Sequence, residues 1–321
     1  MSNPHFRGVF STPMTPFDKD GRLALDVIDP YLDWQVENGI AGIYVLGTWG
    51  GFGLLDLSER RRVAEAYCAA ARRVGMQIIV HISTYSEADT VELARHAVDH
   101  GAHAISAVIP QYYSTGGYLG KDDYKRYFER LVAKTSAPLY LYNNPRTTNV
   151  LLTPEEYVEL AGIGLAGVKD GSKNVAWVTK AQEGLVAAGF EGQIIPGNTV
   201  GLIYGRIYGC DAVTSGGAVV FPDEAAQIHR FLGEGNVESA VVQHRYVLAL
   251  RAAIGLSSAP PAAAHRLLES IGHSLGRARP IWPEVNDQLL GKMRRAIDVA
   301  KRMYGLEKVL PTSEDARELQ A

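Results

Sequence analysis

Eight short apolar runs, separated by longer segments with helical spacing, constrain the fold of this 321-residue chain more than any other feature. Several of the runs are rich in β-branched residues, which is typical of strands that are buried on both faces. In chain order the runs cover residues 8–11, 40–46, 77–82, 104–109, 138–142, 165–168, 193–195 and 211–214. We therefore expect eight strands.

The segments between these runs predict helices, because their apolar residues follow a helical period and stop signals end several of them. Glycines at positions 39, 75 and 101 are predicted stops, and Ser86 and Thr153 are predicted N-caps. The predicted helices cover residues 26–38, 58–74, 86–100, 121–134, 154–161 and 174–188.

Eight strands alternating with helices predict an α/β fold of parallel βαβ units that close into a (β/α)8 TIM barrel. We expect the barrel to span residues 1–225. Residues 226–321 have helical periodicity and predict a C-terminal helical extension packed on the barrel. A doubly wound open sheet is the competing architecture, but its nucleotide-binding fingerprint does not occur in the sequence.

Composition excludes several classes of function. The formal charge is −3 and the sequence has no basic stripe, so nucleic acid is not an expected partner. The sequence contains no apolar stretch of membrane-spanning length, and its first residues lack a signal-peptide pattern. The two cysteines do not form a metal-binding motif or a disulfide framework. We expect a cytoplasmic protein that has no membrane partner.

In a barrel of this kind, active-site groups come from the carboxyl ends of the strands and the loops that follow. Lys169 stands directly at the end of the apolar run 165–168, as the residue that follows it. Most other lysines lie in polar helical segments. Desolvation at a barrel mouth lowers the pKa of an ammonium and frees an amine that can attack a ketone and form a Schiff base. The alternative is a strand-end lysine that pairs with Asp170 or points to solvent.

Tyr142 ends the run that precedes Lys169 and shares a strand face with Tyr140, so it is predicted to converge with the lysine. A tyrosine hydroxyl can move the protons that carbinolamine formation and dehydration require. Thr48, after the second run, is a third group within reach of the same mouth. The alternative for Tyr142 is packing, because the chain has 16 tyrosines.

Five motifs occur in order along the chain: Thr15-Pro16-Phe17, Gly47-Thr48-Trp49-Gly50-Gly51, Pro110-Gln111-Tyr112, Tyr142-Asn143-Asn144-Pro145 and Gly167-Val168-Lys169-Asp170. Together they resemble the dihydrodipicolinate synthase / N-acetylneuraminate lyase family of class I aldolases and lyases. The resemblance covers nearly the whole chain. It implies that Lys169 is the Schiff-base lysine and Tyr142 the general acid/base, and that neither a metal nor an organic cofactor is needed.

The resemblance also implies that Thr48 and Tyr112 complete a hydroxyl relay. In the family the relay tyrosine comes from across a tight dimer, so Tyr112 is expected to serve a neighbouring subunit in a homo-oligomer built as a dimer of dimers. The turn after the second strand, with the amides of Trp49 and Gly50, is implied to hold the carboxylate of a 2-oxo acid.

The sequence departs from the family at several positions. Trp49 and Gly51 replace a hydroxyl residue and a glutamate, and Thr147 stands where the synthases carry an arginine, with Arg146 one place earlier. Asn198 replaces an acidic residue that is often found there. The predicted substrate-binding residues are Trp49, Gly50, Arg146, Thr147, Gly197, Asn198 and Thr214.

These features predict a Schiff-base lyase that acts on pyruvate or another 2-oxo acid. Aldol cleavage, condensation and dehydration of a 2-oxo-3-deoxy acid or an aryl-pyruvate type of substrate are the candidate reactions. Trp49 is similar to an aromatic residue in the hydratase-aldolases that cleave arylidene-pyruvates. The first alternative is dihydrodipicolinate synthase, which condenses pyruvate with aspartate semialdehyde, and the second is a non-catalytic barrel that binds 2-oxo acids.

Two charged clusters are set aside. His96, His100 and His103 have a spacing that suggests a metal, but Gly101 interrupts the helix, so we expect solvated histidines at a helix end. The arginines at positions 60–62, 72 and 73 are expected to form the solvated face of one helix.

Overall fold

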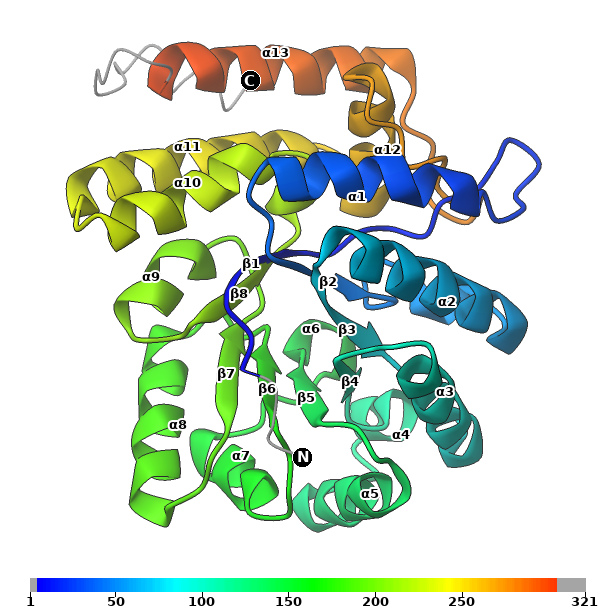
Figure 1. Cartoon of the computed structure of the whole chain (residues 1–321), viewed down its shortest axis with the longest axis vertical. Helices are drawn as coiled ribbons and strands as arrows, with labels where there is room; N and C mark the ends of the chain where they lie inside the picture. Colours follow the sequence, from blue (N-terminus) through cyan, green and yellow to red (C-terminus); the bar gives the residue numbers. More distant parts are fainter. Residues whose placement is uncertain (1–4, 305–321) are drawn as a thin grey trace.

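A parallel sheet of eight strands forms the centre of the computed structural model, which describes residues 5–304 (Figure 1). The hydrogen-bonded order is β7-β6-β5-β4-β3-β2-β1-β8, and β7 and β8 contact each other, so the barrel is nearly closed. The predicted (β/α)8 barrel is confirmed. The strands are β1 (Gly8–Ser11), β2 (Gly42–Val45), β3 (Gln77–His81), β4 (Ala104–Ala107), β5 (Leu139–Asn143), β6 (Gly167–Asp170), β7 (Gln193–Pro196) and β8 (Ala212–Ser215).

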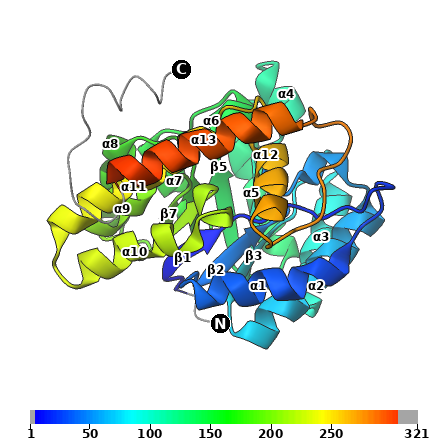
Figure 2. The ribbon, with the colours of Figure 1, turned by 90° about the horizontal axis from the view of Figure 1, so that it is seen from above.

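Eight helices connect these strands or follow the last of them and surround the barrel (Figure 2). Two of them, over residues 121–134 and 154–161, have the predicted bounds. The helices are α1 (Ile28–Glu37), α2 (Leu57–Val74), α3 (Glu87–Asp99), α5 (Lys121–Lys134), α7 (Pro154–Ala161), α8 (Val175–Ala188), α9 (Gly201–Ile207) and α10 (Pro222–Gly233).

Local signals explain where several helices begin and end. Ser86 and Thr153 accept hydrogen bonds from backbone amides as the predicted N-caps of α3 and α7. Gly75 ends α2 in the left-handed conformation, which glycine adopts without a Cβ clash. Short elements were not predicted, because one turn or two cannot show a sustained period. They are α4 (Gln111–Thr115), α6 (Pro145–Thr148), α9, and the 3-10 turns η2 (Phe52–Leu54) and η3 (Gly217–Val219). The 3-10 turn η1 (Leu25–Val27) overlaps the start of the helix predicted over residues 26–38.

One strand boundary matters for the site. The run at 165–168 predicts a strand that ends before Lys169, but β6 continues through Asp170. Lys169 and Asp170 each pair in register with a residue of β5 and of β7, so the ladder extends past the last apolar side chain. Lys169 therefore projects from a strand and not from a flexible loop.

Two buried layers hold the barrel together. Apolar side chains between the sheet and the helices form the larger layer, and aromatic residues including Phe10, Tyr44 and Tyr140 fill the barrel interior. Gly42 and Gly167 make room for these rings, because a Cβ at either position would lie 2.4–2.5 Å from a ring carbon of Phe10 or Tyr140. The interior of the barrel is thus filled by side chains and does not form a pore.

Three further helices, α11 (Val237–Ile254), α12 (Pro260–Ser270) and α13 (Asp287–Tyr304), follow α10. Figure 1 shows α11 alongside α10, with α13 beyond it. The boundary predicted between residues 225 and 226 falls within α10, and residues 305–321 of the predicted extension lie outside the described residues. Among the described residues, no helix combines the length and apolar character needed to span a bilayer.

Candidate active site

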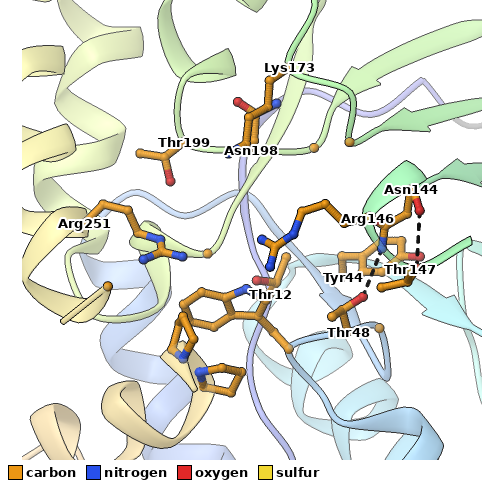
Figure 3. Close-up of a pocket in the computed structure, with 18 of the residues that line it drawn as sticks. Thr12, Tyr44, Thr48, Asn144, Arg146, Thr147, Lys173, Asn198, Thr199 and Arg251 are labelled. Atoms are coloured by element: carbon orange, nitrogen blue, oxygen red, sulfur yellow. Dashed lines mark hydrogen bonds between the residues drawn. The ribbon is translucent and has the colours of Figure 1, made fainter. Parts of the chain in front are cut away.

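A cavity of 530 Å³ lies at the carboxyl ends of the strands, and residues from the barrel and the C-terminal helices line it (Figure 3). Its volume is in the range of small-molecule sites. Among the described residues, its lining contains no His, Cys, Asp or Glu, so it offers no set of metal ligands. Lining residues that enter the argument are Thr12, Tyr44, Thr48, Trp49, Gly50, Tyr142, Asn144, Arg146, Thr147, Lys169, Lys173, Gly197, Asn198, Arg251 and Trp282.

Lys169 lies at the inner end of this cavity and is 4% exposed. Its Nζ is 3.6 Å from the ring centroid of Tyr44 and 3.8 Å from that of Tyr142. Burial lowers the pKa of the Lys169 ammonium well below its ordinary value, because the charged form is deprived of water. The neutral, nucleophilic amine is therefore favoured here.

Asp170 does not neutralise this lysine. Its carboxylate accepts hydrogen bonds from Asn143 Nδ2 at 2.9 Å and from the hydroxyl of Ser172 at 2.6 Å. Because consecutive strand residues point to opposite faces, Asp170 is directed away from the barrel interior. The alternative in which Lys169 pairs with Asp170 is wrong, and so is the alternative in which it points to solvent.

Tyr142 and Thr48 meet beside the lysine. Their hydroxyl oxygens are 3.5 Å apart, and Asn144 Nδ2 donates to Thr48 Oγ1 at 3.3 Å. Figure 3 marks the contact between Thr48 and Asn144 with a dashed line. Burial raises the pKa of the Tyr142 hydroxyl, and the contact with Thr48 opposes this in part. Tyr142 thus remains a protonated donor at neutral pH, next to an amine that favours its neutral form.

The turn after β2 provides free backbone amides. Leu46 has a φ of 57°, an uncommon value for a branched residue, and the chain turns sharply from there. At Gly50, a Cβ would lie 2.8 Å from the backbone nitrogen of Leu46, so only glycine fits. Among the described residues, no group accepts a hydrogen bond from the amide of Trp49 or Gly50. Such amides are suited to a carboxylate.

The ring of Tyr44, which contacts Lys169, belongs to a buried polar network. The Tyr44 hydroxyl is 2.9 Å from Ser106 Oγ and 3.2 Å from His81 Nδ1. Burial lowers the pKa of His81 well below its ordinary value, with smaller contributions from the charges of Arg60 and Lys169. The imidazole is therefore neutral, so it places no positive charge next to Lys169.

The position of Arg60 differs from the predicted one. It is buried at 3% exposure and donates to the carbonyl oxygens of His81 and Ser83. The prediction that this arginine belongs to a solvated helix face is therefore wrong for Arg60. Helical period alone could not reveal this, because the partners are carbonyls at the end of β3, distant in sequence.

Arg146 points into the cavity although it stands one place before the position expected for an arginine, and Thr147 lines the cavity next to it (Figure 3). The short helix α6 begins at Pro145 and turns the chain so that both side chains reach the opening. Trp49 lines the same region, and its indole lies against Gly216, where a Cβ would be 2.5 Å from the ring.

The remaining predicted residues have different positions. Gly197 lines the cavity and packs against the Lys169 stem, since a Cβ there would lie 3.3 Å from Lys169 Cγ. Asn198 also lines it. Thr214 is buried on β8 with an unpartnered hydroxyl and is not among the lining residues. Tyr112 is 70% exposed on α4 and does not line this chain's cavity either.

Several lining residues escaped the sequence analysis. Tyr44 lies inside an apolar run that reads as core, although its inward phase on β2 is a usable signal. Arg251 on α11 and Trp282 after α12 come from the C-terminal part of the chain, and no local pattern indicates where those helices pack.

The histidine cluster lies outside the cavity. His96 Nε2 is 2.9 Å and His100 Nε2 3.4 Å from Glu65 Oε1, so these histidines share a partner on α2. The three ligand atoms lie within 4.8 Å of one another. His103 is apart from them, and its Nδ1 accepts a hydrogen bond from the amide of Ile78. The prediction of solvated histidines is wrong for His96, which is largely buried.

Comparison with known proteins shows the family to which the chain belongs. The model of the dihydrodipicolinate synthetase family matches residues 5–299. An uncharacterized DapA-like lyase of Halobacterium salinarum is 34% identical over 250 residues, covering 77% of this chain and 79% of that protein. A 4-hydroxy-tetrahydrodipicolinate synthase of Kosmotoga olearia is 28% identical, covering 79% and 85%. The solved structure of YagE from Escherichia coli K12, in complex with pyruvate, has a TM-score of 0.84 at 22% identity and covers 93% of this chain and 99% of that one.

Proposed function

Since this chain belongs to the dihydrodipicolinate synthetase family, whose members are lyases, we propose that Lys169 forms a Schiff base with the ketone of pyruvate or a related 2-oxo acid. In this proposal Tyr142 is the general acid/base and Thr48 relays protons to it. The reaction is aldol cleavage or condensation, or the dehydration of a 2-oxo-3-deoxy acid or an aryl-pyruvate type of substrate.

One observation carries the proposal. A buried lysine, free of any carboxylate partner among the described residues, projects into a cavity next to a protonated tyrosine and a turn with two free amides. Each part has a use in Schiff-base chemistry. The amine is the nucleophile, the phenol supplies and recovers protons, and the amides hold the substrate carboxylate.

The first stage forms the imine. The Lys169 Nζ lone pair attacks the C2 carbonyl carbon. The nitrogen then loses one proton, which passes through the hydroxyls of Thr48 and Tyr142 to the carbonyl oxygen, and a neutral carbinolamine forms. The nitrogen lone pair then expels that hydroxyl, which leaves as water after protonation by Tyr142. The product is an iminium whose positive charge lies next to C3. Tyr142 is left as a phenolate, which the Thr48 hydroxyl, 3.5 Å away, stabilises until the phenolate takes up a proton in the second stage.

The second stage uses the iminium to accept electrons. In cleavage, Tyr142 takes the proton of the C4 hydroxyl, the C3–C4 bond breaks, and its electron pair moves into the iminium to give an enamine and an aldehyde. Protonation of C3 and hydrolysis of the imine release pyruvate and regenerate Lys169. Condensation is the same sequence in reverse. The rings of Tyr44 and Tyr142, both within 4 Å of Nζ, keep the iminium oriented.

Trp49 favours a substrate with a flat or bulky group beyond C4. Its indole borders the cavity next to the amide turn, where the family pattern has a small hydroxyl residue. A tryptophan at this place narrows the cavity on one side and offers an apolar face. The proposed substrates are therefore arylidene-pyruvates or 2-oxo-3-deoxy acids.

A second candidate is dihydrodipicolinate synthase, which condenses pyruvate with aspartate semialdehyde. Arg146 favours it, because this side chain points into the cavity, where it can bind the carboxylate of the aldehyde (Figure 3). The replacements at Trp49 and Thr147 oppose it. Comparing turnover of aspartate semialdehyde with that of arylidene-pyruvates and 2-oxo-3-deoxy acids separates the two candidates.

The Lys169→Ala variant tests the proposal as a whole. We expect it to lose at least 10³-fold in turnover of any accepted substrate, since the covalent route is removed. Lys180→Ala changes an exposed lysine on α8 and is the matched control. A Lys169→Ala enzyme with full turnover would contradict the proposal. A wild-type chain that binds pyruvate but never turns over would support the non-catalytic barrel instead.

The proposed role of Tyr112 depends on the association of two subunits. It lies on α4 in an exposed aromatic cluster with Tyr85 and Tyr113, next to the mouth of the barrel. We propose that it completes the hydroxyl relay of a neighbouring subunit in a homo-oligomer, built as a dimer of dimers. The contact of Tyr112 with Tyr85, 6.4 Å between ring centroids, gives the cluster a defined shape for such an interface.

A further inference from the structure

A second cluster of titratable side chains lies on the outside of the barrel, between α2 and α3. These two helices run side by side and contact each other (Figure 1). His96 on α3 and His100 at its C-terminal cap are four residues apart and share one face, and Glu65 comes from the facing α2. None of the three residues lines the cavity that contains Lys169. The cluster is therefore separate from the proposed Schiff-base chemistry.

The potential ligand atoms of this cluster converge on one place. Nε2 of His96 is 2.9 Å and Nε2 of His100 is 3.4 Å from the same atom, Oε1 of Glu65. The two imidazole rings are stacked with 4.2 Å between their centroids, and the three atoms lie within 4.8 Å of one another. In a tetrahedral zinc site with bonds of about 2.0–2.1 Å, two ligand atoms are about 3.3–3.4 Å apart. Both nitrogen–oxygen separations are close to that spacing.

A hydrogen bond orients the ring of His100 in the way that metal binding requires. Its Nδ1 is 2.7 Å from the carbonyl oxygen of His96, and a carbonyl oxygen only accepts, so Nδ1 carries the hydrogen. In the neutral ring the Nε2 atom then carries the lone pair, on the side of Glu65. Metal-binding histidines commonly donate their other ring N–H to a backbone carbonyl in this manner.

Glu65 lacks a basic partner of its own. Among the described residues, no lysine or arginine forms an ion pair with its carboxylate, whereas Glu92 on α3 is paired with Arg61. Arg72 on α2 donates instead to the carbonyl oxygen of His100. The lone pair of a neutral His100 and the carboxylate of Glu65 repel each other unless a cation lies between them. One metal ion can accept electron pairs from all three ligand atoms at once.

We propose that Glu65, His96 and His100 bind a divalent transition-metal ion, with zinc as the expected ion, and that this ion links α2 to α3. Imidazole nitrogen suits zinc, nickel and copper, whereas magnesium and calcium prefer oxygen ligands. Three protein ligands leave a fourth position for water, and Glu65 and His100 are partly exposed, so the ion can enter from solvent. Because both helices supply ligands, the bound ion stabilises the folded chain.

Calorimetric titration of the untagged, metal-free chain with Zn²⁺ tests the proposal. We expect one ion to bind per chain and Zn²⁺ to raise the Tm, and we expect no rise with Mg²⁺. The Lys169→Ala variant should bind Zn²⁺ as the wild type does, so the outcome is independent of the proposed function. A wild-type chain that does not bind Zn²⁺ would overturn the proposal and identify the cluster as an ion pair between Glu65 and a protonated histidine.

Substitution locates the ion. In Glu65→Gln and in His100→Gln, which change partly exposed side chains, we expect the affinity for Zn²⁺ to fall at least tenfold and the rise in Tm to disappear. Glu92→Gln removes an exposed carboxylate from the same pair of helices and keeps both responses. The Tm of each variant without metal confirms that it folds. Equal affinity for Zn²⁺ in the wild type and in both ligand variants would overturn the proposal, because the ion then binds elsewhere.

Discussion

At the scale of single residues, Lys169 is an amine that favours its neutral form and Tyr142 is a phenol that keeps its proton, and the proposed mechanism divides the chemistry between them. The same cause acts on both, because burial disfavours whichever form is charged. Neither pKa shift depends on a neighbouring carboxylate. The lysine therefore becomes reactive from its position in a packed barrel, between two aromatic rings.

This division predicts a pH dependence. Trapping of pyruvate on Lys169 with cyanoborohydride should increase with pH as the ammonium loses its proton, with a midpoint well below the 10.5 of an ordinary lysine. Turnover should persist until Tyr142 ionises, above the ordinary tyrosine value of 10.0. Between the folded and unfolded pKa values of Lys169 the unfolded chain binds the extra proton, so the free energy of unfolding rises with pH there. A trapping midpoint near 10.5 would contradict the account.

The hydroxyl of Tyr142 is tested by Tyr142→Phe. We expect kcat to fall about 10²- to 10⁴-fold, the usual range for removal of a general acid/base. The ring is retained, so the packing around Lys169 should be preserved. Tyr140→Phe removes a hydroxyl from the same strand face, where it contacts Gln193 away from the cavity, and serves as the control. Equal losses in the two variants would indicate a structural effect.

Sequence alone located the residues whose place at the cavity follows from strand position. Lys169 and Tyr142 end apolar runs on neighbouring strands, and register then brings them together. Arg251 and Trp282 could not be found in this way, because their approach to the cavity depends on how α11 and α12 pack against the barrel. Arg60 was misplaced for a related reason, since its carbonyl partners lie on another element.

At the scale of elements, the backbone geometry of the turn after β2 determines the shape of the proposed carboxylate site. Strain at Leu46 and the close approach at Gly50 shape a turn whose Trp49 and Gly50 amides have no acceptor among the described residues. The eight strands and the longer helices were predictable, because hydrophobic period identifies them. This turn was located only as a motif, since its conformation depends on contacts that no period encodes.

Gly50→Ala tests the turn. The added Cβ would lie 2.8 Å from the Leu46 backbone, so the turn must shift and the two amides move. We expect the KM for pyruvate to increase at least tenfold and the free energy of unfolding to fall by about 1–3 kcal/mol. Gly53→Ala, three residues later, meets nothing within 4 Å and should behave as wild type. A Gly50→Ala enzyme with unchanged KM for pyruvate would exclude this turn as the carboxylate site.

At the scale of the whole molecule, the C-terminal helices take part in the site as well as in packing. Helix α11 supplies Arg251, and the start of α12 lines the cavity with Pro260 and Pro261. The barrel thus carries the proposed reactive groups, and the later helices form another side of the same cavity. We expect substitutions on that side to change specificity without disturbing Lys169.

Assembly gives a further prediction at this scale. If Tyr112 serves the neighbouring subunit, Lys169→Ala and Tyr112→Phe chains should complement each other when refolded as a mixture. Each mixed dimer would hold one site with both groups intact, so an equal mixture should recover about a quarter of wild-type activity if subunits pair at random. Light scattering gives the oligomeric state. Activity that never exceeds the average of the two separate variants would show that Tyr112 does not act across an interface.

The central claim is that Lys169 bonds covalently to a 2-oxo acid, and borohydride reduction in the presence of pyruvate tests it most directly. Intact-mass measurement should show one pyruvate-derived adduct per chain, and peptide mapping should locate it on Lys169. Lys173, which lines the same cavity, is the internal comparison. No adduct, or an adduct on Lys173 alone, would contradict the account.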